Sequence, residues 1–266
     1  MKTLKRFAYW WNSNDEVTPG KLDKLQYTDE LLHMMNTYCT LKEQSGNALR
    51  ISSMGKPLIE LACAKLDTQV HTYKDRCTYW VISMGIYGEA LIKSLMLAKG
   101  FTFTHDQTEV KLGPMVGHVD GVVDGTTVFD IKFMSHMYFR DFTTSPDDSR
   151  GYITQLSLYR KALNLPKAAF LCFNKTTGEC RIVRLQRQAY QEALYSVKEK
   201  LEVLKKVRTV EDMVKYVKPP EPRVLSKGKH KGKRVVPDSM KYSKYVEAIY
   251  GSDYLVDEAH YKKWEP

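Results

Sequence analysis

Residues 117–132 read GHVDGVVDGTTVFDIK, and the rest of the chain is interpreted around this stretch. Its two halves are rich in valine, isoleucine and phenylalanine, which favour β-strands. Between them stands Asp124-Gly125, and an Asp-Gly pair flanked by apolar residues is a strong signal for a β-hairpin. We therefore expect two antiparallel strands joined by a tight turn.

Three charges interrupt these apolar strands: Asp120, Asp130 and Lys132. Because side chains alternate between the two faces of a strand, the length of the turn fixes where the aspartates point. A two-residue turn pairs Asp120 with Phe129 and separates the aspartates, whereas a three-residue loop with glycine in the left-handed conformation pairs Asp120 with Asp130. Opposed carboxylates repel unless a cation lies between them. A divalent-metal site, with Lys132 beside it, thus requires the three-residue loop; an edge hairpin with its charges in water is the alternative.

The same charged residues carry a family resemblance. Asp120 followed by Asp130-Ile131-Lys132 resembles the D…(D/E)xK signature of the PD-(D/E)xK nuclease superfamily. Residues 155–159, QLSLY, match the QxxxY motif of its RecB-like branch, which includes the RecB nuclease domain, lambda-type phage exonucleases and the mitochondrial genome maintenance exonuclease. Each motif alone is weak, but their order and spacing together are specific. The resemblance covers about residues 50–185.

The resemblance implies an α/β fold, in which helices flank a mixed central sheet of the restriction-endonuclease-like kind, with helical N- and C-terminal additions. It implies a metal-dependent DNA nuclease, above all an exonuclease that hydrolyses phosphodiester bonds from DNA ends. A structure-directed DNA endonuclease on the same site, an RNA nuclease and a non-catalytic DNA-binding protein that retains the fold are the alternatives.

The resemblance also implies a cofactor, Mg²⁺ or Mn²⁺, bound by Asp120, Asp130 and Glu89 together with the Ile131 carbonyl. Carboxylate and carbonyl oxygens suit these hard cations. Lys132 would orient or activate a water molecule, or stabilise the phosphate during the reaction. Glu89 stands where these families carry an acidic residue or a histidine on a helix, here expected over 80–99. A surface ion pair with Lys93, four residues on, is the alternative for Glu89.

Two pairs of residues are candidate contacts to the substrate. Ser53 and Lys56 lie in a turn before an expected helix, whose free amide groups can hold a phosphate; an ordinary helix cap is an equal alternative. Gln155 and Tyr159 lie one turn apart on a helix expected over 152–163 and should project together. A half-exposed amphipathic helix is the alternative there.

His118 is a further candidate for contacting the substrate. It stands two residues from Asp120 on the same expected strand, so it can hydrogen-bond a metal ligand or the substrate. A histidine packed in the core is the alternative.

The remainder of the chain is expected to extend this core. A polar loop is expected over 134–150, strands over 168–173 and 180–185, and helices over 28–44 and 187–207. With the resemblance, we expect four segments: 1–49, an N-terminal helical extension; 50–217, the nuclease core; 218–238, a basic linker; and 239–266, a C-terminal helical segment packing on the core.

Composition points to an anionic partner. The 266 residues carry a net charge of +10, which favours DNA, and the Gly/Lys run at 227–234 reads as an arm on the DNA backbone or a solvated loop. A homo-oligomer or a recombination or replication protein is a further candidate partner. No apolar run approaches membrane-spanning length, so no membrane contact is expected.

Five scattered cysteines without a CxxC pair indicate reduced thiols in an intracellular protein. The expected location is therefore the cytoplasm, or the nucleoid of a bacterial host if the gene belongs to a phage. Some RecB-like nucleases hold an iron–sulfur cluster through cysteines near the C-terminus. This chain lacks those cysteines, so no such cluster is expected.

Overall fold

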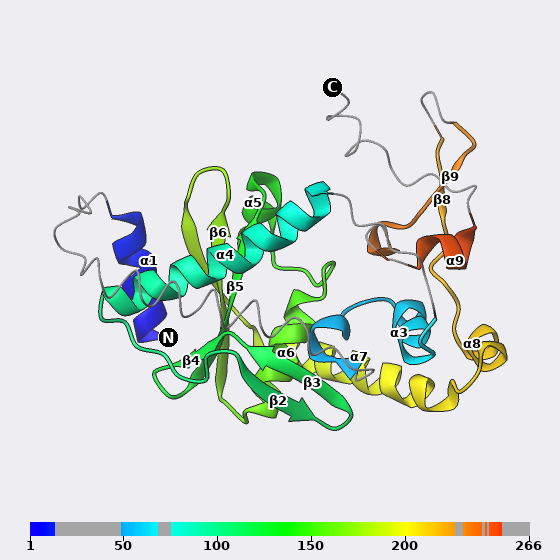
Figure 1. The fold of residues 1–266 in the computed structure, drawn as a ribbon, viewed down its shortest axis with the longest axis horizontal. Helices are drawn as coiled ribbons and strands as arrows, with labels where there is room; N and C mark the ends of the chain where they lie inside the picture. The colour runs from blue at the N-terminus through cyan, green and yellow to red at the C-terminus, as the bar shows by residue number, and fades with distance from the viewer. Residues whose placement is uncertain (14–48, 69–75, 227–230, 241–242, 244, 252–266) are drawn as a thin grey trace.

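A computed structural model describes residues 1–13, 49–68, 76–226, 231–240, 243 and 245–251, with only the backbone of 76–83 and 238. The helix expected over 28–44 and part of the basic 227–234 run lie outside these residues. The described chain is a mixed α/β structure in which helices flank β-sheets, as expected (Figure 1).

Two sheets form the centre of the molecule. The first has the order β1-β3-β2, and the second has the order β4-β5-β6-β7. Within the second sheet, β5 runs parallel to β6 and antiparallel to β4. The bounds are β1 Leu49–Arg50, β2 Thr108–Leu112, β3 Met115–Val119, β4 Gly121–Val123, β5 Thr127–Met134, β6 Lys167–Asn174 and β7 Cys180–Arg184.

The single strand expected before the turn is wrong, because the chain changes sheets at Asp120. Residues up to Val119 pair with β2, whereas Gly121 and those after it pair with β5. Gly121 has a φ of 155°, a conformation that L-residues rarely adopt, so glycine permits the break. Asp120 is thereby placed at the junction of the two sheets.

The turn between β4 and β5 has the three-residue register that the metal hypothesis requires. Val123 pairs with Thr127 and Gly121 with Phe129, which is the register of a three-residue turn; the pairing ends there and does not include Asp120. Gly125 is in the left-handed conformation with a φ of 61°. The three-residue turn is therefore the form that the chain adopts, and the metal site stays a prediction.

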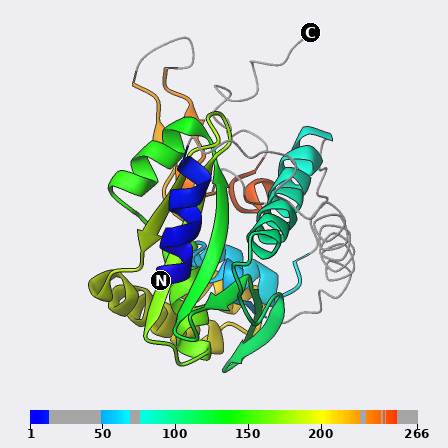
Figure 2. The same ribbon diagram turned by 90° about the vertical axis from the view of Figure 1, so that its left-hand side faces the viewer.

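Helices cover both faces of the four-stranded sheet. One face packs against α6 and α7, and the other against α1 and α4; Figure 1 shows α4 crossing β5, and Figure 2 shows α1 lying along the sheet. The bounds are α1 Lys2–Asn12, α3 Leu58–Lys65, α4 Arg76–Ala98, α5 His136–Thr144, α6 Tyr152–Ala162, α7 Arg187–Lys206, α8 Val210–Tyr216 and α9 Val246–Tyr250. Short elements complete the chain: η2 Ile51–Ser53, η3 Asp238–Met240, β8 Arg223–Val224 and β9 Arg234–Val235.

Most of the long elements agree with the sequence, but the polar loop at 134–150 is wrong. Helix α5 occupies most of it, because Phe139 and Phe142 lie on one helical face and are buried. The Phe142 ring meets Phe170 of β6 edge-on, with ring centroids 5.3 Å apart. Within the residues that the structure describes, no helix combines the length and apolar character needed to cross a membrane. The division into four segments stays a prediction.

Two glycines of α4 provide a test of how this helix packs. A Cβ at Gly88 would lie 2.7 Å from the Phe133 ring on β5, whereas a Cβ at Gly85 would meet nothing within 4 Å. Gly85→Ala is expected to raise the free energy of unfolding by about 1 kcal/mol, because alanine is the better helix former. Gly88→Ala is expected to lower it by about 1–3 kcal/mol, because the helix or the ring must move. Urea unfolding of both variants measures this difference, and equal effects would contradict the packing described.

Candidate functional site

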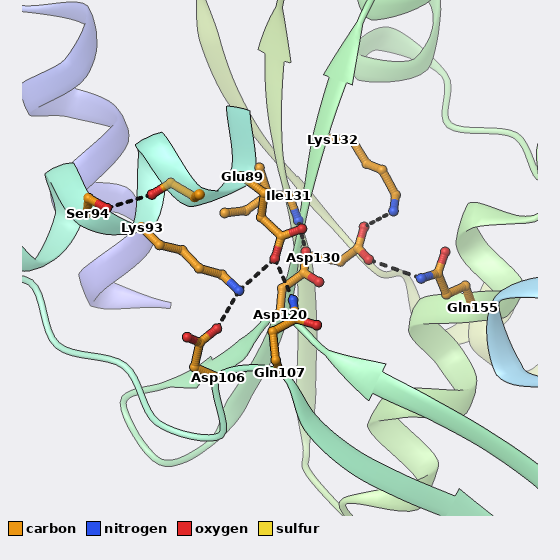
Figure 3. Close-up of polar contacts among 11 residues, drawn as sticks. Glu89, Lys93, Ser94, Asp106, Gln107, Asp120, Asp130, Ile131, Lys132 and Gln155 are labelled. Atoms are coloured by element: carbon orange, nitrogen blue, oxygen red, sulfur yellow. Dashed lines mark hydrogen bonds and ion pairs between the residues drawn. The ribbon is translucent and has the colours of Figure 1, made fainter. Parts of the chain in front are cut away.

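The centre of the site lies on β5. Asp130 and Lys132 share a face of this strand, and Lys132 Nζ lies 2.7 Å from Asp130 Oδ2 (Figure 3). Gln155 of α6 places its Nε2 3.4 Å from the other oxygen, Asp130 Oδ1. Asp130 is only 1% exposed, while the Lys132 side chain is 17% exposed. The ammonium of Lys132 is therefore the group of this pair that can meet a molecule from solvent.

Asp120 joins this pair from the junction of the two sheets. Its Oδ2 accepts a 2.7 Å hydrogen bond from the amide of Ile131, which fixes the orientation of the carboxylate. The residue is 8% exposed. Asp120 and Asp130 are thus two buried carboxylates of neighbouring chain segments.

Burial raises the pKa values of both aspartates. Burial raises the pKa of Asp120 to about 6, and the Asp130 carboxylate adds to this, against the opposing effects of Lys93, Lys132 and the Ile131 amide. Burial also raises the pKa of Asp130, although Lys132 opposes it. For Lys132, burial would lower the pKa, but the two aspartates outweigh burial and raise it. A cation at the carboxylates would relieve this cost.

Glu89 is held by other polar side chains at the border of the site. Its Oε1 lies 2.7 Å from Lys93 Nζ and accepts a 2.8 Å hydrogen bond from Gln107 Nε2. Lys93 also contacts Asp106 Oδ1 at 2.7 Å. The Glu89–Lys93 pair therefore forms, but it is not on the surface, because Lys93 is fully buried.

The sequence assigns no role to Asp106 or Gln107, and Lys93 appears in it only in the surface ion pair that is the alternative for Glu89. Lys93 stands next to the buried Ile92 in a largely apolar helix, and this position is the signal in the sequence that could have indicated its burial. The two partners lie in a loop with no motif. Charge repulsion from Glu89 contributes to the raised pKa of Asp130, so this group acts on the central pair.

The donor set fits a hard divalent cation in its chemistry. Mg²⁺ is commonly bound by one or two carboxylates and keeps several water molecules. Asp120 and Asp130 offer two buried carboxylates, and the pKa of each is raised. Within the described ranges, however, no group of three or more His, Cys, Asp or Glu side chains is arranged to hold a metal ion. The roles of Glu89 and of the Ile131 carbonyl as ligands stay predictions.

The turn with Ser53 and Lys56 lies against the start of α6. Gly55 approaches Gly151 so closely that a Cβ on Gly55 would lie 2.1 Å from the Gly151 Cα. Ser53 ends η2, and the Lys56 ammonium lies 2.9 Å from Glu60 Oε2. The structure thus brings this turn next to the helix that carries Gln155, and contact of Ser53 and Lys56 with a substrate stays a prediction.

Gln155 and Tyr159 project together from α6, as expected. The Gln155 Nε2 lies 3.5 Å from the Tyr159 hydroxyl. Tyr159 is 3% exposed and packs on Gly117 of β3, where a Cβ would lie 2.8 Å from its ring. The alternative of a half-exposed helix is wrong, because most residues from 153 to 159 are buried.

His118 lies on β3, where it is paired with Glu109 of β2. It is neither fully buried nor fully exposed. In the part of the chain that the structure describes, no hydrogen bond joins His118 to Asp120 or Asp130. Its contact with a ligand or a substrate stays a prediction. Among the cysteines, Cys63, Cys172 and Cys180 are buried free thiols.

The raised pKa of Asp120 predicts how the metal-free protein responds to pH. The ionised form costs stability in the folded state, so the penalty is absent below pH 4, grows up to pH 6 and is complete above it. Asp120→Asn is expected to raise the free energy of unfolding by about 1–3 kcal/mol at pH 7.5 and to change it little at pH 4. Urea unfolding in EDTA at both pH values measures this. A destabilised variant at pH 7.5 would contradict the expectation.

Comparisons with known proteins were made on the sequence and on the fold. No protein-family model matches the chain, and no curated protein sequence matches it. An alkaline exonuclease from Laribacter hongkongensis resembles the structure with a TM-score of 0.45 at 13% identity, over 63% of this chain and 91% of that one. Its complex with dAMP gives 0.43 at 13% identity, with the same coverage. A phage-related exonuclease from Haemophilus somnus 129PT gives 0.45 at 17% identity, over 63% of this chain and 94% of that one.

Proposed function

We propose that the chain is a divalent-metal-dependent nuclease that hydrolyses phosphodiester bonds in DNA, acting as an exonuclease from DNA ends. One observation carries the proposal. Asp120 accepts a hydrogen bond from the amide of Ile131, the residue after Asp130; both aspartates are buried, and the Lys132 ammonium lies 2.7 Å from Asp130. This supports the D…(D/E)xK resemblance, because that signature requires the three side chains to converge.

The side chains divide the chemistry among themselves. Asp120 and Asp130 would hold the cation, with the Ile131 amide and Gln155 keeping their carboxylates in place. When bound, Mg²⁺ or Mn²⁺ supplies positive charge that favours ionised water and stabilises the scissile phosphate. Lys132, charged and partly exposed, would orient the attacking water or stabilise the negative charge that develops on the phosphate.

The overall charge supports DNA as the partner. A net charge of +10 attracts a polyanion through a term that is independent of sequence and weakens with salt. Contacts of Ser53, Lys56 and the basic 227–234 run with the DNA backbone belong to this proposal. So do a homo-oligomer or a recombination partner, and a location inside the cell.

Digestion of labelled nucleic acid tests the function. Linear and covalently closed circular DNA, single- and double-stranded, and linear RNA are incubated with Mg²⁺, Mn²⁺ or EDTA. The expected result is metal-dependent loss of linear DNA only, abolished by Asp130→Ala and by Lys132→Ala. Lys111→Ala, which removes a 72% exposed lysine on β2, is the matched control and should cleave normally.

Other outcomes would change the assignment in defined ways. Cutting of closed circles would make the protein an endonuclease, and preferential loss of RNA would make it a ribonuclease. Retained DNA binding without cleavage in any metal would establish a binding protein and refute the proposed activity.

A further inference from the structure

A second buried cation, the ammonium of Lys93, lies at the border of the proposed metal site. The Lys93 side chain is 0% exposed, and its Nζ lies 2.7 Å from both Glu89 Oε1 and Asp106 Oδ1. Figure 3 shows it reaching from α4 to the loop that carries Asp106 and Gln107. A fully buried ammonium is costly unless it is paired and hydrogen-bonded, and this arrangement supplies both.

The loop that supplies these partners has an unusual backbone. His105 and Gln107, on either side of Asp106, have φ values of 60° and 46°, in the left-handed region that favours glycine. Such conformations cost free energy and persist where surrounding contacts impose them. Gln107 returns one such contact through its 2.8 Å hydrogen bond to Glu89. The loop is thus held in a form that presents a carboxylate and an amide to Lys93 and Glu89.

Lys93 keeps its charge and acts on the aspartates. Burial alone would lower its pKa, but the carboxylates of Glu89, Asp120 and Asp106 outweigh burial and raise it. In turn, the Lys93 charge opposes the rise in the pKa of both Asp120 and Asp130. The Lys93 ammonium therefore already supplies a positive charge next to the carboxylates of this region.

Two ammonium groups already contact carboxylates of this region. Lys93 lies against Glu89 and Asp106, and Lys132 lies against Asp130. A second divalent cation would have to bind against two nearby ammonium groups, which disfavours it.

We propose that the Lys93 ammonium takes the place of a second metal ion. It pairs with the Glu89 carboxylate, and the site binds a single divalent cation through Asp120 and Asp130. The inference rests on the proposed function for the identity of the cation. Lys93 is then a positioning residue that sets the number of ions, and Glu89 is its partner.

Titration with Mn²⁺, followed by the electron paramagnetic resonance signal of the free ion, tests this without DNA. The wild-type protein is expected to bind one Mn²⁺ per chain. Two ions per chain would overturn the inference and leave the proposed nuclease intact. No bound Mn²⁺ would overturn both the inference and the proposed metal dependence.

Two carboxylate variants separate a ligand from a partner. Glu89→Gln keeps an oxygen for Lys93 and Gln107, so one Mn²⁺ should still bind, with a Kd within about threefold of wild type. Asp130→Asn should weaken binding by at least about tenfold. Glu109→Gln, which removes a 49% exposed carboxylate on β2, is the matched control. Equal loss in Glu89→Gln and Asp130→Asn would make Glu89 a ligand and overturn the inference.

Removing the lysine should change the number of ions. Lys93→Met removes the ammonium group that contacts Glu89 and Asp106, so a second Mn²⁺ is expected to bind in the folded variant. Lys111→Met is the control and should bind one. A folded Lys93→Met protein that still binds one Mn²⁺ would refute the substitution of an ion by Lys93. If circular dichroism shows that Lys93→Met is unfolded, the wild-type and Glu89→Gln titrations still decide the question.

Discussion

Asp130→Asn is expected to reduce the kcat/KM of DNA cleavage by at least about 100-fold in Mg²⁺. Asparagine keeps the shape of the side chain in its buried place on β5, and its oxygen can still accept from Gln155. It removes the negative charge that would hold the cation and that lies 2.7 Å from Lys132. The fold should survive, because the change also removes a buried charge whose pKa is already raised.

Initial cleavage rates of end-labelled linear DNA, with circular dichroism and DNA affinity measured in parallel, check this expectation. Asp141→Asn is the matched control, because that aspartate lies 61% exposed on α5 and pairs only with Arg140 among the described residues. It should cleave at the wild-type rate. An Asp130→Asn protein within tenfold of wild type would mean that the carboxylate does not hold the cation.

Gly55→Ala is expected to lower the free energy of unfolding by about 3 kcal/mol or more. The new Cβ would lie 2.1 Å from the Gly151 Cα, which belongs to the backbone, so no side-chain rotation can relieve the overlap. The turn and the start of α6 must separate. Since α6 carries Gln155, the rate of cleavage should fall as well.

Urea unfolding measures the loss, and Gly113→Ala provides the comparison. Gly113 has a φ of 57°, and a Cβ added there would meet nothing within 4 Å, so its replacement tests backbone strain without a close contact. That variant should lose only about 1 kcal/mol. Equal losses in the two variants would show that the approach of Gly55 to Gly151 is not as close as described.

The long periodic elements could be predicted from the sequence because neighbouring residues determine them. Helices α6 and α7 and strands β6 and β7 follow from the spacing of apolar residues. Helix α5 was not predictable in this way, because Phe139 and Phe142 are fixed by contact with residues far along the chain, such as Phe170. Its polar remainder resembles a loop.

The site was only partly readable for the same reason. The sequence gives Asp120, Asp130 and Lys132, but it leaves the turn between them open to two registers. The three-residue form brings Asp124 into contact with the Met1 amino group and the Thr3 hydroxyl of the distant N-terminal helix. The contacts of Lys93 could not be predicted either, because its partner Asp106 lies in a loop that no local sequence pattern connects to α4.

Strand β5 is paired on both sides only at residues 127–129, where β4 and β6 flank it; from Asp130 onward it is paired with β6 alone. Beyond the end of β4, the Asp120 carboxylate takes the place of a neighbouring strand, because it accepts the hydrogen bond of the Ile131 amide. The exchange of that amide hydrogen with solvent therefore reports on whether the Asp120 side chain is in place. A residue of the candidate site thus also closes part of the sheet that carries it.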